Sequence, residues 1–390
     1  MSDPHAHDER LRRWRLALGD PPESGLPRLT GDDARIAGAL DQLYGDQPPS
    51  RRGGLGSSAP RVAKWLGELR DLFPSQVVQV IQKDALDRHG LKMLLLEPEL
   101  LSTLEPDVSL VADLMALGHA VPEASKEVAR QVVRQVVDDL LARLATRTTD
   151  AVRGAVRRAS RTRRPRFADI DWDRTVRANL HHWQPTHRSI VPERLHGHAR
   201  GQRRMDEVVL LVDQSGSMAP SVVYASIFAA VLASLPSLRT QLVCFDTSIV
   251  DLTELLADPV DVLFGVQLGG GTDICGALGY VMERIAEPAR THLVIVSDLY
   301  EGGDADGMLA RGRALVASGV DLIVLLALSD EGRPSYDPRH AAAFAGMGCP
   351  VFACTPEHFP DLMATALSRG DVHAWAASHD IALVRADAAT

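Results

Sequence analysis

Cysteine, aromatic residues and long apolar runs are all scarce in this chain. The four cysteines lie far apart and none belongs to a Cys-x-x-Cys pair, so neither a disulfide framework nor a zinc ribbon is indicated. We find no apolar run that approaches the ~18 residues needed to span a bilayer, and residues 1–15 are charged and lack the apolar core of a signal peptide. These absences predict a cytoplasmic protein without a membrane anchor.

A nucleotide-binding loop is missing as well. The chain contains no Gly-x-x-x-x-Gly-Lys-Ser/Thr motif, so any ATP chemistry has to come from another protein. A glycine-rich segment, Gly54-x-Gly56-x-x-Ala59, follows prolines and arginines rather than a strand. We interpret it as a flexible connector, with a loop that contacts a partner as the alternative.

The 390 residues suggest two or three domains, and 45% hydrophobic with 24% charged residues is typical of globular proteins. The net charge of −9 is unevenly placed, because arginines crowd residues 147–204. Two interpretations are open. The arginines either pair with acids of a neighbouring domain or subunit, which we favour because few aromatic residues lie between them, or they bind nucleic acid.

The first part of the chain has the pattern of an all-α domain, which we place at residues 1–146 and follow with an Arg-rich junction at 147–205. The clearest expected helix begins near Pro122 and carries a broad apolar face from Val128 to Leu144. Histidines 181, 182, 187, 196 and 198 lie in the junction. No cysteine accompanies them and their spacing fits no zinc finger, so we expect surface or packing histidines.

From residue 206 strands and helices alternate, which predicts an α/β fold with a doubly wound, mostly parallel sheet. We place this domain at 206–370 and a tail at 371–390. The expected strands are 208–212, 241–245, 248–252, 292–296, 321–327 and 350–353. The expected helices are 220–235, 259–264, 274–286, 308–317, 339–345 and 355–367, the last capped by Thr355 with Pro356 at its first position.

Oxygen-bearing side chains gather where three of these segments meet the carboxyl edge of the sheet. They are Asp213, Ser215, Ser217, Thr272 and Asp298. Each has an ordinary explanation as a helix cap or a loop acid, but together they supply the hard oxygen ligands of Mg²⁺, with Mn²⁺ and Ca²⁺ as alternatives. Two carboxylates ~4 Å apart repel by roughly 4 kcal/mol at an effective dielectric of ~20, so the pair needs a cation or a shared proton. We favour the cation.

This set resembles the metal-ion-dependent adhesion site of von Willebrand factor A (VWA) domains. The wider chain resembles bacterial VWA proteins encoded beside MoxR-type AAA+ ATPases and their CoxE-like relatives, through RWRL at 13–16, RANLHHW at 177–183, LVDQSGSM at 211–218, QLGGGT at 267–272 and VSDLYEGG at 296–303. The resemblance implies that Ser215, Ser217 and Thr272 contact Mg²⁺ and that Asp213 and Asp298 act directly or through water. It also implies that an Asp or Glu of a partner protein fills the open coordination position.

The third loop departs from the VWA pattern. Many VWA domains have Asp-Gly there, whereas Asp298 is followed by Leu299, Tyr300 and Glu301, with Asp304 and Asp306 nearby. These additional acids would either compete with a partner carboxylate or recruit a second cation.

We therefore expect a binding module rather than an enzyme, working with a MoxR-type AAA+ ATPase, a client protein that offers an Asp or Glu, or both. A metal-assisted hydrolase or phosphatase at the same site is one alternative. Against it, the chain has Asp213-x-Ser215 where a haloacid-dehalogenase-like site needs Asp-x-Asp, and Ser215 lacks a Gly-x-Ser-x-Gly elbow. Nucleic-acid binding through the Arg-rich junction is the other alternative.

Overall fold

The computed structural model describes residues 29, 31–44, 59–88, 95, 101, 103–117, 122–159, 161–165, 167, 170–198, 205–266, 269–328 and 335–386. The RWRL motif at 13–16 and the loop around Gly54 lie outside these residues. Contacts divide the chain into two compact units, residues 1–136 and 137–390. Each unit is described by itself.

The first unit is helical in its described part. It contains α2 (Asp32–Tyr44), α3 (Ala59–Leu72), α4 (Ser75–Arg88), α6 (Val108–Leu117) and the start of α7 (Glu123–Ala159). Its core includes Trp65, which is 3% exposed and donates its indole N–H to the Ala39 carbonyl at 3.1 Å. Buried Gln82 accepts the backbone N–H of Glu105 and donates to its carbonyl, so this polar side chain is satisfied.

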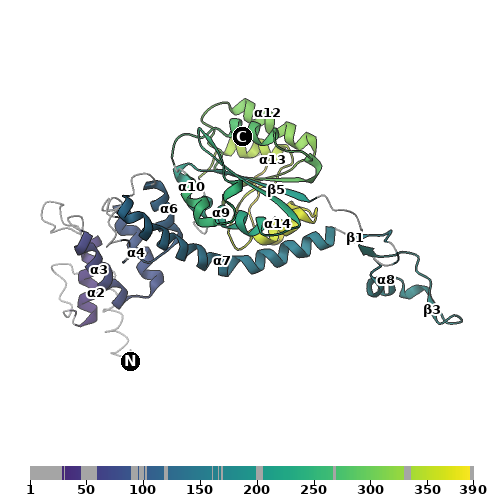
Figure 1. Cartoon of the computed structure of the whole chain (residues 1–390), viewed down its shortest axis with the longest axis horizontal. Coiled ribbons are helices and arrows are strands. Elements are labelled where there is room, and N and C mark those ends of the chain that lie inside the picture. Colours follow the sequence, from purple (N-terminus) through teal and green to yellow (C-terminus); the bar gives the residue numbers. More distant parts are fainter. Residues whose placement is uncertain are drawn as a thin grey trace, which may run out of the picture. The chain divides into compact units, whose positions relative to one another are not determined.

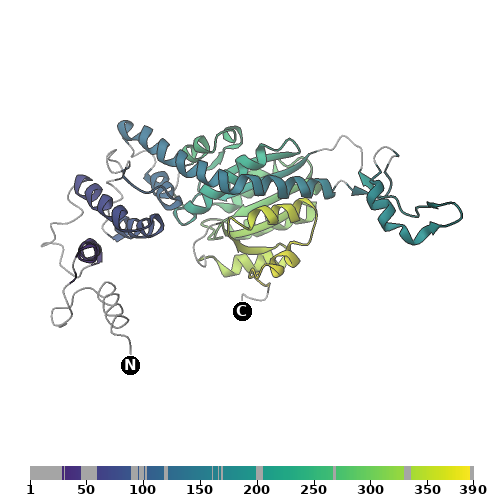
Figure 2. The same cartoon turned by 90° about the horizontal axis from the view of Figure 1, so that it is seen from below.

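Helix α7 runs unbroken for 37 residues and is seen at full length in Figure 2. The boundary that the sequence predicts between residues 146 and 147 falls inside it. In the second half of α7, Val152 and Ala155 are completely buried, and the Arg147 guanidinium lies 2.6 Å from the carboxylate of Asp361. An arginine of the predicted junction thus pairs with an acid of the sheet-containing domain, as the ion-pair interpretation expects.

A small substructure follows α7. Short strand β1 (Arg161–Thr162) pairs with β4 (Gly197–His198), and β2 (Trp183–Gln184) pairs with β3 (Ser189–Ile190). Between β1 and β2 lie α8 (Trp172–Ala178), capped by the Asp171 side chain, and the 3-10 turn η5 (Leu180–His182). Several of its apolar side chains are exposed: Phe167, Trp172, Val176, Leu180, Trp183 and Val191.

A six-stranded sheet forms the centre of the second unit. Its strands are β5 (Asp206–Asp213), β6 (Leu238–Phe245), β7 (Ile249–Asp251), β8 (Thr291–Val296), β9 (Asp321–Leu328) and β10 (Val351–Cys354). Their spatial order is β10-β9-β8-β5-β6-β7, and every neighbouring pair is parallel except β6 with β7. The predicted doubly wound, mostly parallel α/β architecture is confirmed.

Helices cover both faces of this sheet (Figure 1). They are α9 (Ala219–Ala233), α10 (Pro259–Gly265), α11 (Ile274–Met282), α12 (Ala305–Ser318), α13 (Pro338–Gly346), α14 (Phe359–Leu367) and α15 (Val372–Ser378). Successive strand residues point to opposite faces, so Val209 and Leu211 pack with α11, α12 and α13. On the other face Phe228 of α9 meets Phe359 of α14, with ring centroids 4.4 Å apart.

The last predicted helix begins later than the sequence suggested. Thr355 does not cap it, because residues 356–358 form a turn in which His358 donates its N–H to the Thr355 carbonyl. Helix α14 starts at Phe359, and Pro360 rather than Pro356 occupies its first turn. Proline fits either place, so the sequence did not distinguish them. The predicted tail contains α15, whose Trp375 ring lies 6.0 Å from that of Phe352.

One described segment corrects the expectation about apolar runs. Residues 216–233, which include α9, are long and apolar enough to cross a membrane by length and composition alone. Its serines and proline interrupt the apolar residues, so the segment is not one continuous apolar run. It is 72% buried within the protein, as a core helix of a doubly wound sheet must be.

The four cysteines are free and buried. Burial raises the pKa of Cys244 to about 12, with a further contribution from the negative charge of Asp213. Burial likewise raises the pKa of Cys349 to about 12 and also raises that of Cys354.

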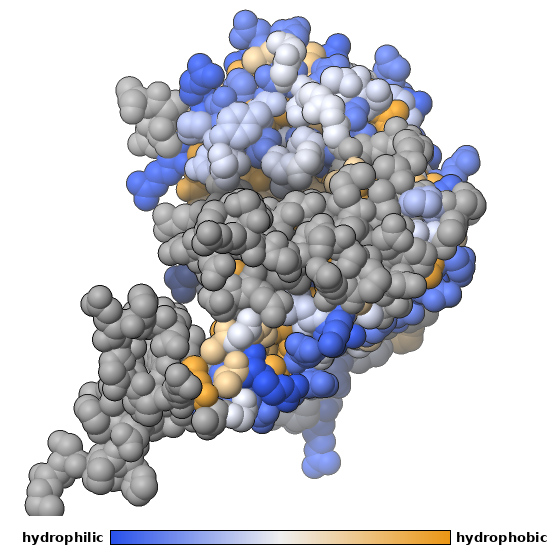
Figure 3. Space-filling view, turned by 90° about the vertical axis from the view of Figure 1, so that its left-hand side faces the viewer, coloured by the Kyte–Doolittle hydropathy of each residue, from blue (hydrophilic) through white to orange (hydrophobic). Residues whose placement is uncertain are grey.

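On the face drawn in Figure 3, hydrophobic residues of the described part appear in small groups between hydrophilic ones, which is ordinary for a protein surface.

Candidate functional site

The candidate site lies where the strand order reverses. Strand β5 has β6 on one side and β8 on the other, and the crevice beyond such a switch point is the usual ligand site of open α/β sheets. Asp213 ends β5 and is completely buried. Its carboxylate accepts the Ser215 backbone N–H and the Ser297 hydroxyl, both at 2.8 Å. The two central strand tips are thereby joined through one acid.

Three further oxygens line up beside Asp213. The hydroxyls of Ser215 and Ser217 are 3.3 Å apart, and the Ser217 hydroxyl donates to Asp298 Oδ2 at 2.8 Å. Because Mg²⁺ binds oxygen at 2.0–2.1 Å in an octahedron, neighbouring ligands of one ion lie ~3 Å apart. The oxygens of these three side chains therefore have the spacing of adjacent ligands of a single Mg²⁺.

Thr272 is held near this group by its backbone. Its carbonyl accepts the Gly302 N–H at 2.8 Å, which fastens the second loop to the third. The same loop is fastened to the first loop by the bond from the Gly269 N–H to the Gln214 carbonyl. Gly269 and Gly270 have φ of 135° and 88°, a conformation that glycine adopts without strain. The structure thus brings all five predicted residues to one edge of the sheet.

Burial dominates the electrostatics of this site. Burial raises the pKa of Asp213 above its usual value, hydrogen bonds from Ser215 and Ser297 oppose that rise, and the negative charge of Asp298 adds to it. The ionised form of Asp213 is therefore less favoured in the protein than in water. A bound cation would offset both the burial and the repulsion between the two acids.

Two of the additional acids of the third loop, Glu301 and Asp304, accept backbone hydrogen bonds. Glu301 accepts the Ile274 N–H at 2.7 Å through one oxygen and the Gly303 N–H at 3.0 Å through the other. Asp304 caps α12 by accepting the Gly307 N–H at 2.8 Å, and Asp273 caps α11 by accepting the Gly276 N–H at 2.7 Å. Glu301 consequently joins the third loop to the first turn of α11, a role that its sequence position did not reveal.

Replacing Glu301 with alanine is expected to lower the free energy of unfolding by about 1–2 kcal/mol, because two backbone N–H groups lose their acceptor. Urea unfolding measures the change. Asp306→Ala is the matched control, since Asp306 is exposed in the first turn of α12, and it should cost about 0.5 kcal/mol or less. Equal losses in the two variants would contradict the joining role of Glu301.

Leu299 explains how the chain departs from the Asp-Gly pattern. Its φ is 62°, the left-handed conformation that favours glycine. Its side chain is nevertheless completely buried in the core formed with α11 and α12. A buried leucine contributes roughly 1.5–3 kcal/mol, which exceeds the ~1–2 kcal/mol cost of the backbone conformation. Leu299 therefore adopts the left-handed conformation that glycine favours, and its side chain also packs into the core.

This balance predicts an unusual order of stability among variants. Both Leu299→Ala and Leu299→Gly should lose about 2–5 kcal/mol through the missing side chain. The glycine variant should be the more stable of the two by about 1 kcal/mol, because alanine keeps the left-handed strain. Thermal or urea unfolding of the two proteins tests the order. An alanine variant more stable than the glycine variant would show that the backbone relaxes away from this conformation.

Comparison with known proteins identifies the class. The family described as VWA domain containing CoxE-like protein matches residues 142–363, more than half of the chain. The chain belongs to this family. It is 38% identical over 364 residues to the uncharacterized protein YehP of Escherichia coli (strain K12), and the match spans 92% of this chain and 96% of YehP.

Solved structures give weaker likenesses. An aerotolerance-related membrane protein from Bacteroides fragilis NCTC 9343 aligns with 43% of this chain and 98% of its own, at 14% identity and a TM-score of 0.32. Conserved hypothetical protein BatB from Bacteroides thetaiotaomicron aligns with 42% of this chain and 99% of its own, at 13% identity and a TM-score of 0.30. The Deinococcus radiodurans RO (RSR) protein aligns with 93% of this chain and 74% of its own, at 13% identity and a TM-score of 0.31.

Proposed function

We propose that this protein is a Mg²⁺-dependent interaction subunit of the cytoplasm, which binds an Asp or Glu of a partner protein at the strand-tip site. We further propose that it acts with a MoxR-type AAA+ ATPase in a chaperone-like or remodelling system. Mn²⁺ and Ca²⁺ are the alternative ions. The observation that carries the metal site is the 2.8–3.3 Å spacing of the Ser215, Ser217 and Asp298 oxygens.

The chemistry of the donors supports recognition of a carboxylate. The two serine hydroxyls and the Thr272 hydroxyl are neutral, so an ion that they help to hold keeps most of its positive charge. Ser217 is exposed and Ser215 half-buried, whereas Asp213 is buried. The hydroxyl side of the site therefore faces solvent, where a carboxylate from another protein can reach the ion.

The hydrogen bonds of the serines favour binding over catalysis. Ser215 contacts Ser217, and Ser217 donates to Asp298. A nucleophilic serine needs a general base within hydrogen-bonding reach, usually a histidine. His340 lies near the third loop, but its ring nitrogen contacts the Leu299 carbonyl at 2.9 Å. Its position is that of a structural residue.

The ATPase partnership rests on the resemblance to VWA proteins encoded beside MoxR-type ATPases. The lack of a phosphate-binding loop supports it, because a remodelling system needs ATP hydrolysis from a second protein. In this arrangement the VWA domain selects a partner, and the ATPase supplies the free energy of ATP hydrolysis.

Affinity purification of the full chain from its native host, with Mg²⁺ or with EDTA, tests the proposal. A MoxR-type ATPase should be recovered with Mg²⁺, and EDTA or Asp213→Asn should remove the partner that binds through the metal. Asp306→Asn serves as the charge-matched control and should behave as wild type. Recovery of no AAA+ ATPase would overturn the pairing, and an unchanged set of partners in EDTA would overturn the metal-dependent contact.

A further inference from the structure

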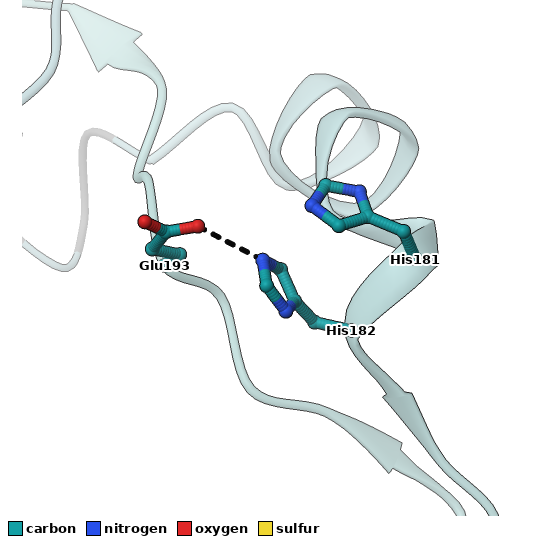
Figure 4. A group of neighbouring side chains, drawn as sticks. All are labelled: His181, His182 and Glu193. Carbon is teal, nitrogen blue, oxygen red and sulfur yellow. Dashed lines mark hydrogen bonds and ion pairs between the residues drawn. The ribbon is translucent and has the colours of Figure 1, made fainter.

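A second group of metal-ligand side chains lies in the substructure between β1 and β4. His181 and His182 belong to η5, and Glu193 lies on the segment that follows β3. One ligand atom from each lies within 4.8 Å of the others, and His182 Nε2 is 2.9 Å from Glu193 Oε2. Figure 4 shows the His182 ring in contact with the Glu193 carboxylate, with the His181 ring farther from that carboxylate. Among the residues that the structure describes, this is the one group of three or more His, Cys, Asp or Glu ligands so closely placed.

The backbone that carries these side chains is held by buried polar contacts. Asn179 is 1% exposed, and its amide donates to the carbonyls of Thr175 and Arg194. Its oxygen accepts the backbone N–H groups of Glu193 and Arg194 at 2.9 and 3.2 Å. One side chain thereby fastens Glu193 directly to the turn that precedes His181. The backbone that carries the group is therefore held by the fold, while the side chains of His181 and Glu193 are exposed and that of His182 is half-buried.

Thr175 holds the same segment in a similar way at His196, two residues after Arg194. Thr175 is 1% exposed, and its hydroxyl accepts the His196 N–H at 3.0 Å and donates to the His196 carbonyl at 3.2 Å. Buried polar side chains of this kind fix a local structure in one arrangement. The relative positions of η5 and the Glu193 segment are consequently set before any ligand binds.

We propose that His181, His182 and Glu193 bind a late first-row transition metal ion, with Zn²⁺ the best match. Two imidazole nitrogens and one carboxylate oxygen are ligands that suit Zn²⁺, whereas Mg²⁺ takes oxygen ligands. Three protein ligands leave the fourth tetrahedral position to water or to a group from another molecule. The site differs in ligand chemistry and in location from the strand-tip site.

The geometry requires little rearrangement. Zinc–nitrogen and zinc–oxygen distances of about 2.0–2.2 Å place tetrahedral ligands ~3.4 Å apart. The His182–Glu193 separation of 2.9 Å is close to that value, and the 4.8 Å limit for the group leaves at most a side-chain turn of His181. The rings of the two histidines lie with centroids 4.0 Å apart, so the His181 ring has to turn away from His182 to bring its nitrogen to the ion.

The sequence had suggested surface or packing histidines, because no cysteine accompanies them. In the structure His181 is exposed and His182 half-buried, and the proposal adds a ligand role because the third ligand, Glu193, lies outside any cysteine-and-histidine spacing rule. A simple His182–Glu193 ion pair is the rival explanation, and it gives His181 no role.

Calorimetry with Zn²⁺ on the full-length protein, in excess Mg²⁺ to occupy the strand-tip site, tests the proposal. We expect one Zn²⁺ per chain, and a loss of affinity of about tenfold or more in each of His181→Ala, His182→Ala and Glu193→Gln. His187→Ala is the matched control, because His187 is exposed between β2 and β3 and lies outside the group. It should bind Zn²⁺ as wild type does.

Two results would overturn the inference. One is the absence of Zn²⁺ binding by the wild type, and the other is equal affinity in wild type and the three variants. A loss in His182→Ala and Glu193→Gln without a loss in His181→Ala would overturn the assignment of His181 as a ligand. Asp213→Asn should keep its Zn²⁺ affinity, so failure of the strand-tip proposal and failure of this one are distinguishable.

Discussion

Replacing Asp213 with asparagine should weaken Mg²⁺ binding by about 100-fold or more, which corresponds to about 2.7 kcal/mol. The substitution removes one of the two negative charges that the site offers to an ion. It keeps the shape of the side chain, and the new amide can still accept the Ser215 N–H while its NH₂ group faces the Ser297 hydroxyl. Because burial disfavours the ionised form of Asp213, the variant should fold at least as well as wild type without metal.

Calorimetry with Mg²⁺ and with Mn²⁺ measures this loss. Asp306→Asn makes the same chemical change on the exposed first turn of α12 and should leave the affinity within about twofold, as expected for a distant, screened charge. Thermal unfolding in EDTA shows whether each variant is folded. Equal Mg²⁺ affinity in Asp213→Asn and wild type would refute the assignment of the site.

Replacing Phe228 with alanine should lower the free energy of unfolding of the sheet-containing unit by about 3–5 kcal/mol. The ring is completely buried and lies against Phe359, with centroids 4.4 Å apart and planes tilted by 31°. Its loss removes apolar burial and leaves a cavity between α9 and α14, two helices on the same face of the sheet. Urea unfolding should show an earlier midpoint.

Phe264→Ala is the control for this prediction. Phe264 lies on α10 and is 43% exposed, so the same change of side chain should cost less than about 1 kcal/mol. A similar loss in both variants would mean that the α9–α14 contact is not part of the cooperative core.

The architecture of the sheet was predictable because its strands are buried on both faces. Val208 to Val212 form an uninterrupted apolar run, and such runs alternate with helical patterns along the second half of the chain. The position of Asp213 and Asp298 at one edge of the sheet was predictable for the same reason. Asp213 comes directly after such a run and Asp298 follows another by two residues, and the carboxyl ends of parallel strands meet at one edge.

Features that depend on distant contacts were not predictable. Glu301 accepts a hydrogen bond from Ile274, 27 positions away, and no local pattern signals that pairing. Leu299 occupies a conformation that local preference assigns to glycine, and only the burial of its side chain explains it. The group around His182 depends on Asn179, whose contacts fold a later segment back onto η5.

The alkylation rates of the buried cysteines report local unfolding of the protein. A thiol with a pKa of about 12 is ionised to roughly one part in 10⁵ at pH 7, so Cys244 and Cys349 should resist alkylation while the sheet is closed. Modification then requires local unfolding, and its rate at each position reports how often that region opens. Cys244 lies on β6 inside the sheet and Cys354 on the edge strand β10. Alkylation followed by peptide mass analysis would compare how often the centre of the sheet and its β10 edge unfold locally, without any engineered label.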